Sequence, residues 1–297
     1  MATLKDLRNR IKSVKSTQKI TKAMKMVAAA KLRKAQDRAE KGRPYSDKMN
    51  VIISNLKNSI TDIDSAPKLL VGNKKSQKHL CIVMTADRGL CGGFNTNICR
   101  RAKLFFNEVL ESGKELKIIT IGSKGHDQIK RVFGKYIIDK ISFKDLKQIS
   151  INESDQVTTK VIDMFNQDEF DVCTIFYNKF KSIISQEPQA QQVIPILSTI
   201  KKNLQEEAES DNQSQYEYEP DQEEILENLL PKNISTQIFK AFLENAASEQ
   251  GSRMSAMDSA TRNAGDLINK LTINYNRSRQ AVITKELIEI ISGAESL

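Results

Sequence analysis

The chain has 297 residues, a formal net charge of +9, 39% hydrophobic residues, no Trp and only six Pro. Its pI near 9.2 and mean hydropathy of −0.45 are typical of long exposed helices rather than of a single globular core, and they favour an acidic partner or a negative surface. Because no run of about 18 apolar residues occurs, we expect no membrane-spanning helix.

A long, highly charged helix is predicted at the start of the chain. No Pro or Gly precedes Gly42. The apolar residues Leu4, Leu7, Ile11 and Val14 follow one another in steps of three and four, which is the spacing of a helical seam. Such a helix does not fold alone, because it has only one narrow apolar face to bury.

Further along the same helix, the seam becomes polar and a basic stripe runs beside it. The polar positions are Gln18 and Thr21. The seam is predicted to resume with four apolar residues: Met24, Val27, Ala28 and Leu32. Four lysines spaced by threes and fours form the basic stripe: Lys12, Lys15, Lys19 and Lys22. Helical spacing resumes after Pro44, so the helix is predicted to continue to about residue 60.

The middle of the chain has an alternating α/β pattern. Strands are predicted at 80–84, 116–121, 170–177 and 191–197, an extended segment at 136–143, and helices at 95–110, 123–133 and 154–165. Residues 206–224 then hold nine acidic residues and no Lys or Arg, which predicts a solvated acidic loop, with 216–219 expected to pair at a sheet edge. This pattern predicts a small, mostly parallel sheet covered by helices.

The last part of the chain is predicted to be helical from residue 222 to the end, with Pro231, Gly251 and Gly265 as weak points. One heptad position is held by Met254, Thr261, Ile268, Tyr275 and Val282, and a second by Met257, Ala264 and Leu271. We therefore predict an α+β chain. A long antiparallel coiled coil of the N- and C-terminal helices carries a small α/β, Rossmann-like domain. The predicted parts are 1–60 (N-terminal helix), 61–78 (linker), 79–220 (α/β domain) and 221–297 (C-terminal helix).

Residues that carry chemistry are few. The glycine-rich loop 85–95 follows a strand and precedes a helix, but it matches neither GxGxxG nor GxxxxGK[ST], so a tight structural turn is favoured over phosphate binding. Within it, Asp87 and Arg88 are interpreted as an ion pair of the turn. Neither His79 nor His126 has a metal-ligand neighbour at helical spacing. We therefore predict no catalytic, cofactor-binding or metal-binding residue.

The four cysteines show no CxxC spacing and no evident His/Asp relay. The residues that follow the start do not resemble a secretory leader. We therefore expect reduced, mostly buried thiols in a reducing compartment.

Two surfaces leave alternatives open. The basic stripe is interpreted as a solvated helix face, as a nucleic-acid contact, or as a contact with acidic protein loops. The lack of aromatic residues among its lysines, and of any RNP-like or zinc-finger pattern, disfavours nucleic acid. The end of the chain, 281–297, is apolar nearly all round. It docks either on the chain's own N-terminal helix or in a hole of a partner.

Four segments resemble the gamma subunit of F-type ATP synthases: 13–32, 85–95, 247–264 and 274–294. The resemblance spans both ends and the middle of the chain. It implies a central rotor shaft, with the two terminal helices inside a ring of alpha and beta subunits and the C-terminal tip in an apolar bearing. The α/β domain then contacts an epsilon-type subunit and the membrane c-ring. The subunit couples rotation to nucleotide affinity but is itself no enzyme.

The resemblance also implies contact residues. Met24 and Lys25 match positions where family shafts meet acidic loops of the beta subunits. Arg279 and Gln280 match a pair that engages a beta-subunit loop, and Thr284 and Glu286 match their coupling neighbours. Two departures are Gly251-Ser252, where many relatives have small helix formers, and the long acidic loop.

The resemblance to bacterial members implies a peripheral position on the cytoplasmic face of the inner membrane, with the mitochondrial matrix face as the alternative. A basic coiled-coil nucleic-acid binder is the rival function, and an enzyme built on the α/β middle comes third.

Overall fold

The computed structural model describes residues 3–59, 67–73, 75–146, 149–196 and 222–295. By its contacts the chain divides into two compact units, one of Met1–Ala30 with Arg253–Leu297 and one of Lys31–Ser252. This division differs from the predicted parts 1–60, 61–78, 79–220 and 221–297, which follow secondary structure and stay a prediction.

The predicted elements occur in the predicted order, and one further short helix, at Lys68–Val71, lies in the segment predicted as a linker. The helices are α1 Leu4–Ser59, α2 Lys68–Val71, α3 Phe94–Glu111, α4 Ser123–Phe133, α5 Ile151–Asn166 and α7 Gln222–Glu295, with a short 3-10 turn η1 at Gly134–Tyr136. The strands are β1 Lys78–Met84, β2 Glu115–Ile121, β3 Ile137–Ile141, β4 Val172–Phe180 and β5 Gln186–Ile194. The acidic segment, with the pairing predicted at 216–219, lies outside the described residues up to position 221, as do 60–66 of the predicted linker.

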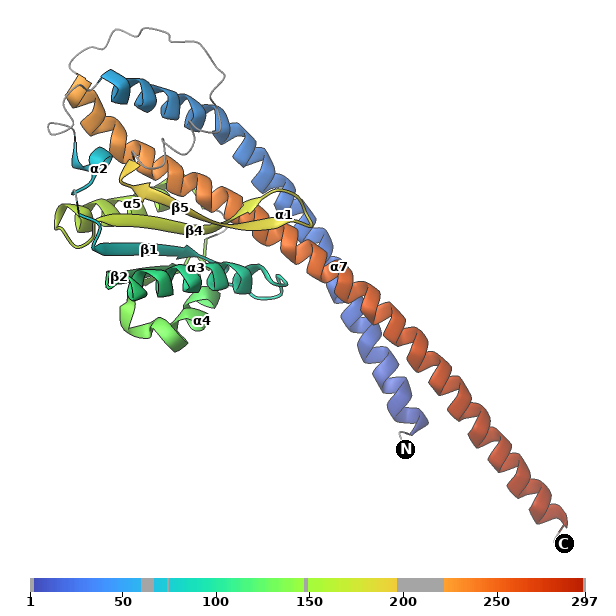
Figure 1. Cartoon of the computed structure of the whole chain (residues 1–297). Helices are drawn as coiled ribbons and strands as arrows, with labels where there is room; N and C mark the ends of the chain where they lie inside the picture. Colours follow the sequence, from blue (N-terminus) through green and yellow to red (C-terminus); the bar gives the residue numbers. More distant parts are fainter. Residues whose placement is uncertain (1–2, 60–66, 74, 147–148, 197–221, 296–297) are drawn as a thin grey trace. The chain divides into compact units, whose positions relative to one another are not determined.

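In the larger unit the five strands form one sheet in the order β3-β2-β1-β4-β5. All neighbours are parallel except β4 and β5, which are antiparallel. Figure 1 shows α3 and α4 on one face of the sheet, and α5 with the part of α7 that belongs to this unit on the other. This arrangement follows from right-handed crossovers, because the connection through α5 returns across the sheet from β3 to β4. The predicted, mostly parallel α/β sheet is confirmed.

The predicted last strand was wrong in its position. It was expected at 191–197, whereas β5 begins at Gln186 and ends at Ile194. The residues QEPQAQQ at its start are polar and include Pro188, so they do not resemble a buried strand. A strand is possible here because β5 lies at the edge of the sheet and pairs only with β4. Pro188 has no backbone N–H group to donate, and an edge strand tolerates this loss because one of its sides has no neighbouring strand.

The smaller unit contains residues from both long helices. Helix α1 starts at a capping pair, in which the Thr3 hydroxyl accepts from the Asp6 amide (3.2 Å) and the Thr3 amide donates to the Asp6 carboxylate (3.1 Å). The predicted seam of Leu4, Leu7, Ile11 and Val14 is half-buried. On α7 the second heptad set is buried: Met257 at 5%, Ala264 at 8% and Leu271 at 7% exposure. Contacts such as Gln18 with Thr261 and Lys25 with Asp258 pair the helices in opposite directions, which confirms the antiparallel coiled coil.

The prediction that Val27 belongs to the seam is wrong. Val27 is 56% exposed, and Lys25 instead lies half-buried beside the partner helix. The seam therefore runs from Thr21 through Lys25 and Ala28 to Leu32 in steps of four, three and four. Residue type alone places Val27 in the seam, but its angular position on the helix does not.

Candidate functional site

A polar layer joins the two helices of the coiled coil near its middle. The Thr261 hydroxyl donates to the Thr21 hydroxyl at 2.8 Å, and the Gln18 side-chain amide donates to the Thr261 carbonyl at 3.5 Å. Gly265 leaves room for Gln18, since a Cβ atom at Gly265 would lie 3.2 Å from the Gln18 side-chain nitrogen. The polar break in the predicted seam is therefore matched by polar and small residues on α7.

One turn further along α1, Lys25 forms an ion pair within the chain. Its ammonium lies 2.6 Å from the Asp258 carboxylate, which Arg262 also approaches at 3.2 Å. The hydrogen bond from Lys25 holds the pKa of Asp258 below its ordinary value, and the positive charges of Lys25 and Arg262 add to this effect. Sequence reasoning missed Asp258. A signal for it existed, because it flanks the seam next to Met257, where coiled coils carry interhelical charge pairs.

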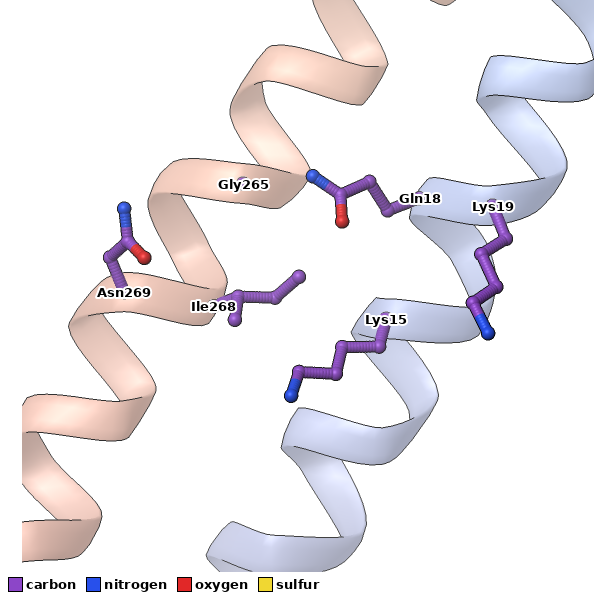
Figure 2. A pocket seen from close by; sticks show the side chains of 6 residues that line it. All are labelled: Lys15, Gln18, Lys19, Gly265, Ile268 and Asn269. Carbon is purple, nitrogen blue, oxygen red and sulfur yellow. The ribbon is translucent and has the colours of Figure 1, made fainter.

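The neighbouring Met24 is half-buried, and the four lysines of the basic stripe are all exposed: Lys12, Lys15, Lys19 and Lys22. A surface hollow of about 430 Å³ lies between the helices, lined by Lys15, Gln18, Lys19, Gly265, Ile268 and Asn269. Figure 2 shows Lys15 and Lys19 on one helix, with Ile268 and Asn269 on the other. The stripe is thus a solvent-facing cationic surface of this unit.

The remaining predicted contact residues lie further along α7. Arg279, Gln280, Thr284 and Glu286 are all exposed, and the Thr284 hydroxyl donates to the Gln280 carbonyl of its own helix at 2.9 Å. Asp258, the partner of Lys25, precedes Arg279 by 21 positions, or roughly 30 Å along a helix. The structure therefore forms two separate groups, Met24 with Lys25 and Arg279 to Glu286.

The apolar end of α7 has no cover from the described part of this chain. All residues from Arg279 to Ser292 are exposed. They include Val282, Ile283, Leu287, Ile288, Ile290 and Ile291, at 41% to 68% exposure. The interpretation in which this tip docks on the chain's own N-terminal helix is therefore wrong for these residues. An apolar surface of this kind is typical of a protein contact.

The glycine-rich loop 85–95 in the larger unit is fastened by its own side chains. The Asp87 carboxylate accepts from the Ser123 amide and hydroxyl (both 2.9 Å), the Ser142 hydroxyl (2.8 Å) and the Phe143 amide (3.2 Å). These bonds, rather than the predicted ion pair with Arg88, hold the carboxylate among the described residues. The loop joins the start of α4 to the end of β3, which supports the interpretation as a structural turn.

We predict that Asp87→Asn makes the stability of the chain less dependent on acid pH. Burial raises the pKa of Asp87, but the hydrogen bonds from Ser123, Ser142 and Phe143 outweigh it and lower the pKa below its ordinary value. A lowered folded-state pKa stabilises the fold above the unfolded value near 3.9, and this contribution disappears as the pH falls through the folded pKa. At neutral pH the substitution is expected to cost about 1–2 kcal/mol, allowing for partial exposure.

Urea unfolding at pH 7 and at pH 3 measures this difference. The matched control is Asp145→Asn, which changes an exposed carboxylate in the connection between β3 and α5 and is expected to leave both values nearly unchanged. An equal loss for Asp87→Asn at both pH values would contradict the assigned role of the carboxylate.

The other polar groups considered in the sequence are poorly placed for catalysis. All four cysteines are buried thiols outside any disulfide bond. Burial raises the pKa of Cys99 to about 11 and raises those of Cys81 and Cys173 as well, so these thiols are not activated nucleophiles. Within the described ranges, no group of three His, Cys, Asp or Glu side chains has the arrangement of a metal site. None of the helices in the described part has the length and apolarity needed to cross a bilayer.

Comparisons with known proteins place this chain in a family. The model of a family described as ATP synthase matches residues 3–297. The ATP synthase gamma chain of Pelagibacter ubique (strain HTCC1062) is 65% identical over 297 residues, and that of Jannaschia sp. (strain CCS1) is 55% identical over 299 residues. Both alignments cover 100% of each chain.

Solved structures give the same result for the fold. A chain from the cryo-EM structure of the Tetrahymena thermophila mitochondrial ATP synthase, central stalk/cring, is 26% identical with a TM-score of 0.60, covering 81% of this chain and 99% of that one. A chain from the Euglena gracilis mitochondrial ATP synthase is 22% identical with a TM-score of 0.69, covering 99% and 94%, and it supports the fold alone. The match of the family model over nearly the whole chain and the full-length relatives show that this chain belongs to the ATP synthase gamma chain family.

Proposed function

We propose that the chain is the rotating central-stalk subunit of a proton-translocating F-type ATP synthase. It couples rotation of the membrane c-ring to the conformational cycle of the catalytic alpha/beta hexamer, in ATP synthesis and in its reverse. Its own role is non-catalytic. The observation that carries this proposal is the uncovered apolar tip of α7 beyond the coiled coil, in a chain of the gamma family. A Tetrahymena relative in a central stalk/cring structure supports the same assignment.

Coupling in such a subunit is a difference in contact free energy between the conformations of the ring. Exposed charges suit this task, because surface ion pairs contribute little and are screened by salt, so the shaft is attracted without being locked. We assign Met24, Arg279, Gln280, Thr284 and Glu286 to contacts with the hexamer.

Lys25 is assigned to the same contact surface, provided that a partner carboxylate can displace Asp258 from its ammonium group. Because its ammonium is bound to Asp258 in this chain, a carboxylate of a beta-subunit loop has to compete with Asp258 for it. We further infer that the α/β domain contacts an epsilon-type subunit and the c-ring. The inferred position is peripheral, on the cytoplasmic face of a bacterial inner membrane, with the mitochondrial matrix face as the alternative.

Purification through a tag on this chain tests the proposal. The expected result is a complex with ATPase activity that contains three alpha and three beta subunits for each copy of the chain. Isolation of the chain alone, together with tight DNA binding that weakens steeply with salt, would instead favour the nucleic-acid function.

We predict that Arg279→Ala lowers the ATPase turnover of the assembled complex by roughly tenfold, the effect of losing about 1.4 kcal/mol of charge-assisted contact. Arg279 is exposed on a part of α7 that its own chain does not cover, so the isolated chain is expected to keep its stability. The matched control is Arg277→Ala, which removes the same charge two positions away. ATP hydrolysis by complexes of equal subunit content measures the effect. Normal turnover with Arg279→Ala would remove this residue from the contact surface.

A further inference from the structure

Strand β4 extends past the end of β1, and helix α7 bonds to its free backbone groups. The β1–β4 ladder ends with the pair Val83 and Phe176. Asn178 lies two residues further along β4. Its backbone amide donates to the Asn245 side-chain oxygen at 3.2 Å, and its carbonyl accepts from the Ser248 hydroxyl at 2.8 Å. Two side chains of α7 thus take the place of the missing continuation of β1.

These polar groups are fully inside the larger unit. The exposed fractions are 1% for Asn178, 7% for Asn245 and 0% for Ser248. A buried backbone group that loses its partner is not compensated by water, so the position of α7 along β4 is strongly specified at this point. We refer to Asn178, Asn245 and Ser248 as the polar clamp.

The polar clamp lies near the carboxyl ends of β1 and β4, the two neighbouring strands between which the strand order reverses. From β1 the chain proceeds to β2 and β3 on one side, whereas β4 lies on the other side. In open α/β sheets, the crevice at the carboxyl ends of two such strands is where ligands bind. Here α7 takes this place. Its Ser252 hydroxyl also donates to the Cys91 carbonyl of the glycine-rich loop at 2.6 Å. The loop and β4 are therefore bonded to one helix at the usual ligand position.

We propose that the polar clamp is a main junction through which torque passes between the α/β domain and helix α7. The inference rests on the proposed function as a rotor subunit. Apolar contacts of α7 with the domain, through residues such as Leu230, Ile234 and Ile238, are non-directional and oppose sliding or rotation of the helix only weakly. Helix α7 is also hydrogen-bonded to the domain at Ser235, whose carbonyl accepts from the Ser154 hydroxyl (2.7 Å), and at Gln237, whose side-chain oxygen accepts from Gln191 (2.9 Å), but neither of these bonds ends on the backbone of a strand. Hydrogen bonds to a strand backbone are directional, so they fix the helix along its axis and about it. Asn245 and Ser248 are positioning residues, not contacts with the hexamer.

The test uses the complete ATP synthase complex in inverted membrane vesicles, with the double variant Asn245→Leu/Ser248→Ala. The measured quantities are ATP synthesis driven by a proton gradient and ATP hydrolysis after the gradient is collapsed. Because the apolar contacts of α7 and its hydrogen bonds at Ser235, Gln237 and Ser252 remain, we expect the complex to assemble. Per assembled complex, synthesis against load is expected to fall roughly 25-fold, the equivalent of two lost hydrogen bonds at about fivefold each, while hydrolysis without load stays near the wild-type rate.

The matched control is Thr236→Val. It removes a buried hydroxyl of α7 that donates to Lys232 of the same helix, at 2.8 Å. This variant is expected to keep the wild-type ratio of synthesis to hydrolysis. If the double variant does not assemble, Ser248→Ala alone keeps the bond of Asn245 and is expected to show a smaller fall of the same ratio.

The outcomes separate the inference from the proposed function. If wild-type complexes containing this chain do not couple hydrolysis to a proton gradient, the proposed function fails. If they do, and the assembled variants keep the wild-type ratio, the polar clamp has only a structural role and the inference alone is overturned. A lower thermal stability with an unchanged ratio likewise overturns the inference and leaves the proposed function standing.

Discussion

Replacing Gly122 with Ala is expected to destabilise the chain by about 3–4 kcal/mol, a fall of roughly 10 °C in the midpoint of thermal unfolding. Gly122 links β2 to α4 with a φ of +97°, which side chains rarely adopt. A Cβ atom there would lie 2.3 Å from the Thr85 carbonyl oxygen. Thr85 cannot retreat, because its amide and hydroxyl both donate to the Ile121 carbonyl.

Gly113→Ala is the matched control for this prediction. Gly113 also has a positive φ, +72°, but no heavy atom lies within 4 Å of the added Cβ atom. Its substitution is expected to lower the free energy of unfolding by only about 1 kcal/mol, the cost of placing a residue with a side chain at a positive φ. Thermal unfolding followed by circular dichroism measures both variants. Equal losses would show that the contact with Thr85 adds nothing to the backbone cost.

Replacing Met24 with Lys is expected to reduce proton pumping per ATP hydrolysed severalfold in the assembled complex. Met24 is half-buried beside the Lys25–Asp258 ion pair, on the surface assigned to acidic loops of the hexamer. An added ammonium is attracted to a carboxylate at particular angular positions of the rotor. If the added contact stabilises one angular position of the rotor by about 1.4 kcal/mol, the rotor leaves that position about tenfold more slowly. ATP hydrolysis is then expected to be coupled less efficiently to rotation and to proton pumping.

Met26→Lys is the matched control, since Met26 is 60% exposed and lies two positions along the helix, on another face. It adds the same charge and is expected to leave coupling nearly unchanged. Proton uptake and ATP hydrolysis by inverted vesicles give the ratio for each variant. Unchanged coupling with Met24→Lys would remove Met24 from the assigned contact surface.

Local patterns were sufficient for most of the fold. The helix at 123–133 and the strands β1 and β2 agree with their predicted positions within a few residues, because period and apolarity are strong in these segments. The prediction was weakest for β5, whose start is polar. Burial of an edge strand depends on its neighbours rather than on its own residues, so its sequence carries a weak signal.

The candidate site was predictable only in part. Spacing and charge indicated the basic stripe and the apolar end of α7, both of which are exposed in the structure. The roles of Met24 and of Arg279 to Glu286 came from the family resemblance, and they stay predictions. The partner of Lys25 required the pairing of two helices whose contact residues are more than 230 positions apart.

By itself, the sequence determined two long helices, an α/β middle, an unusually basic first helix and an apolar last one, since these depend on composition and on short-range spacing. Only the tertiary structure decided which groups meet: Lys25 with Asp258, Asp87 with the start of α4, and Asn245 and Ser248 of α7 with the end of β4. Such contacts depend on helix register and on where each strand ends. A shift of one residue changes them without altering the pattern from which the elements were predicted.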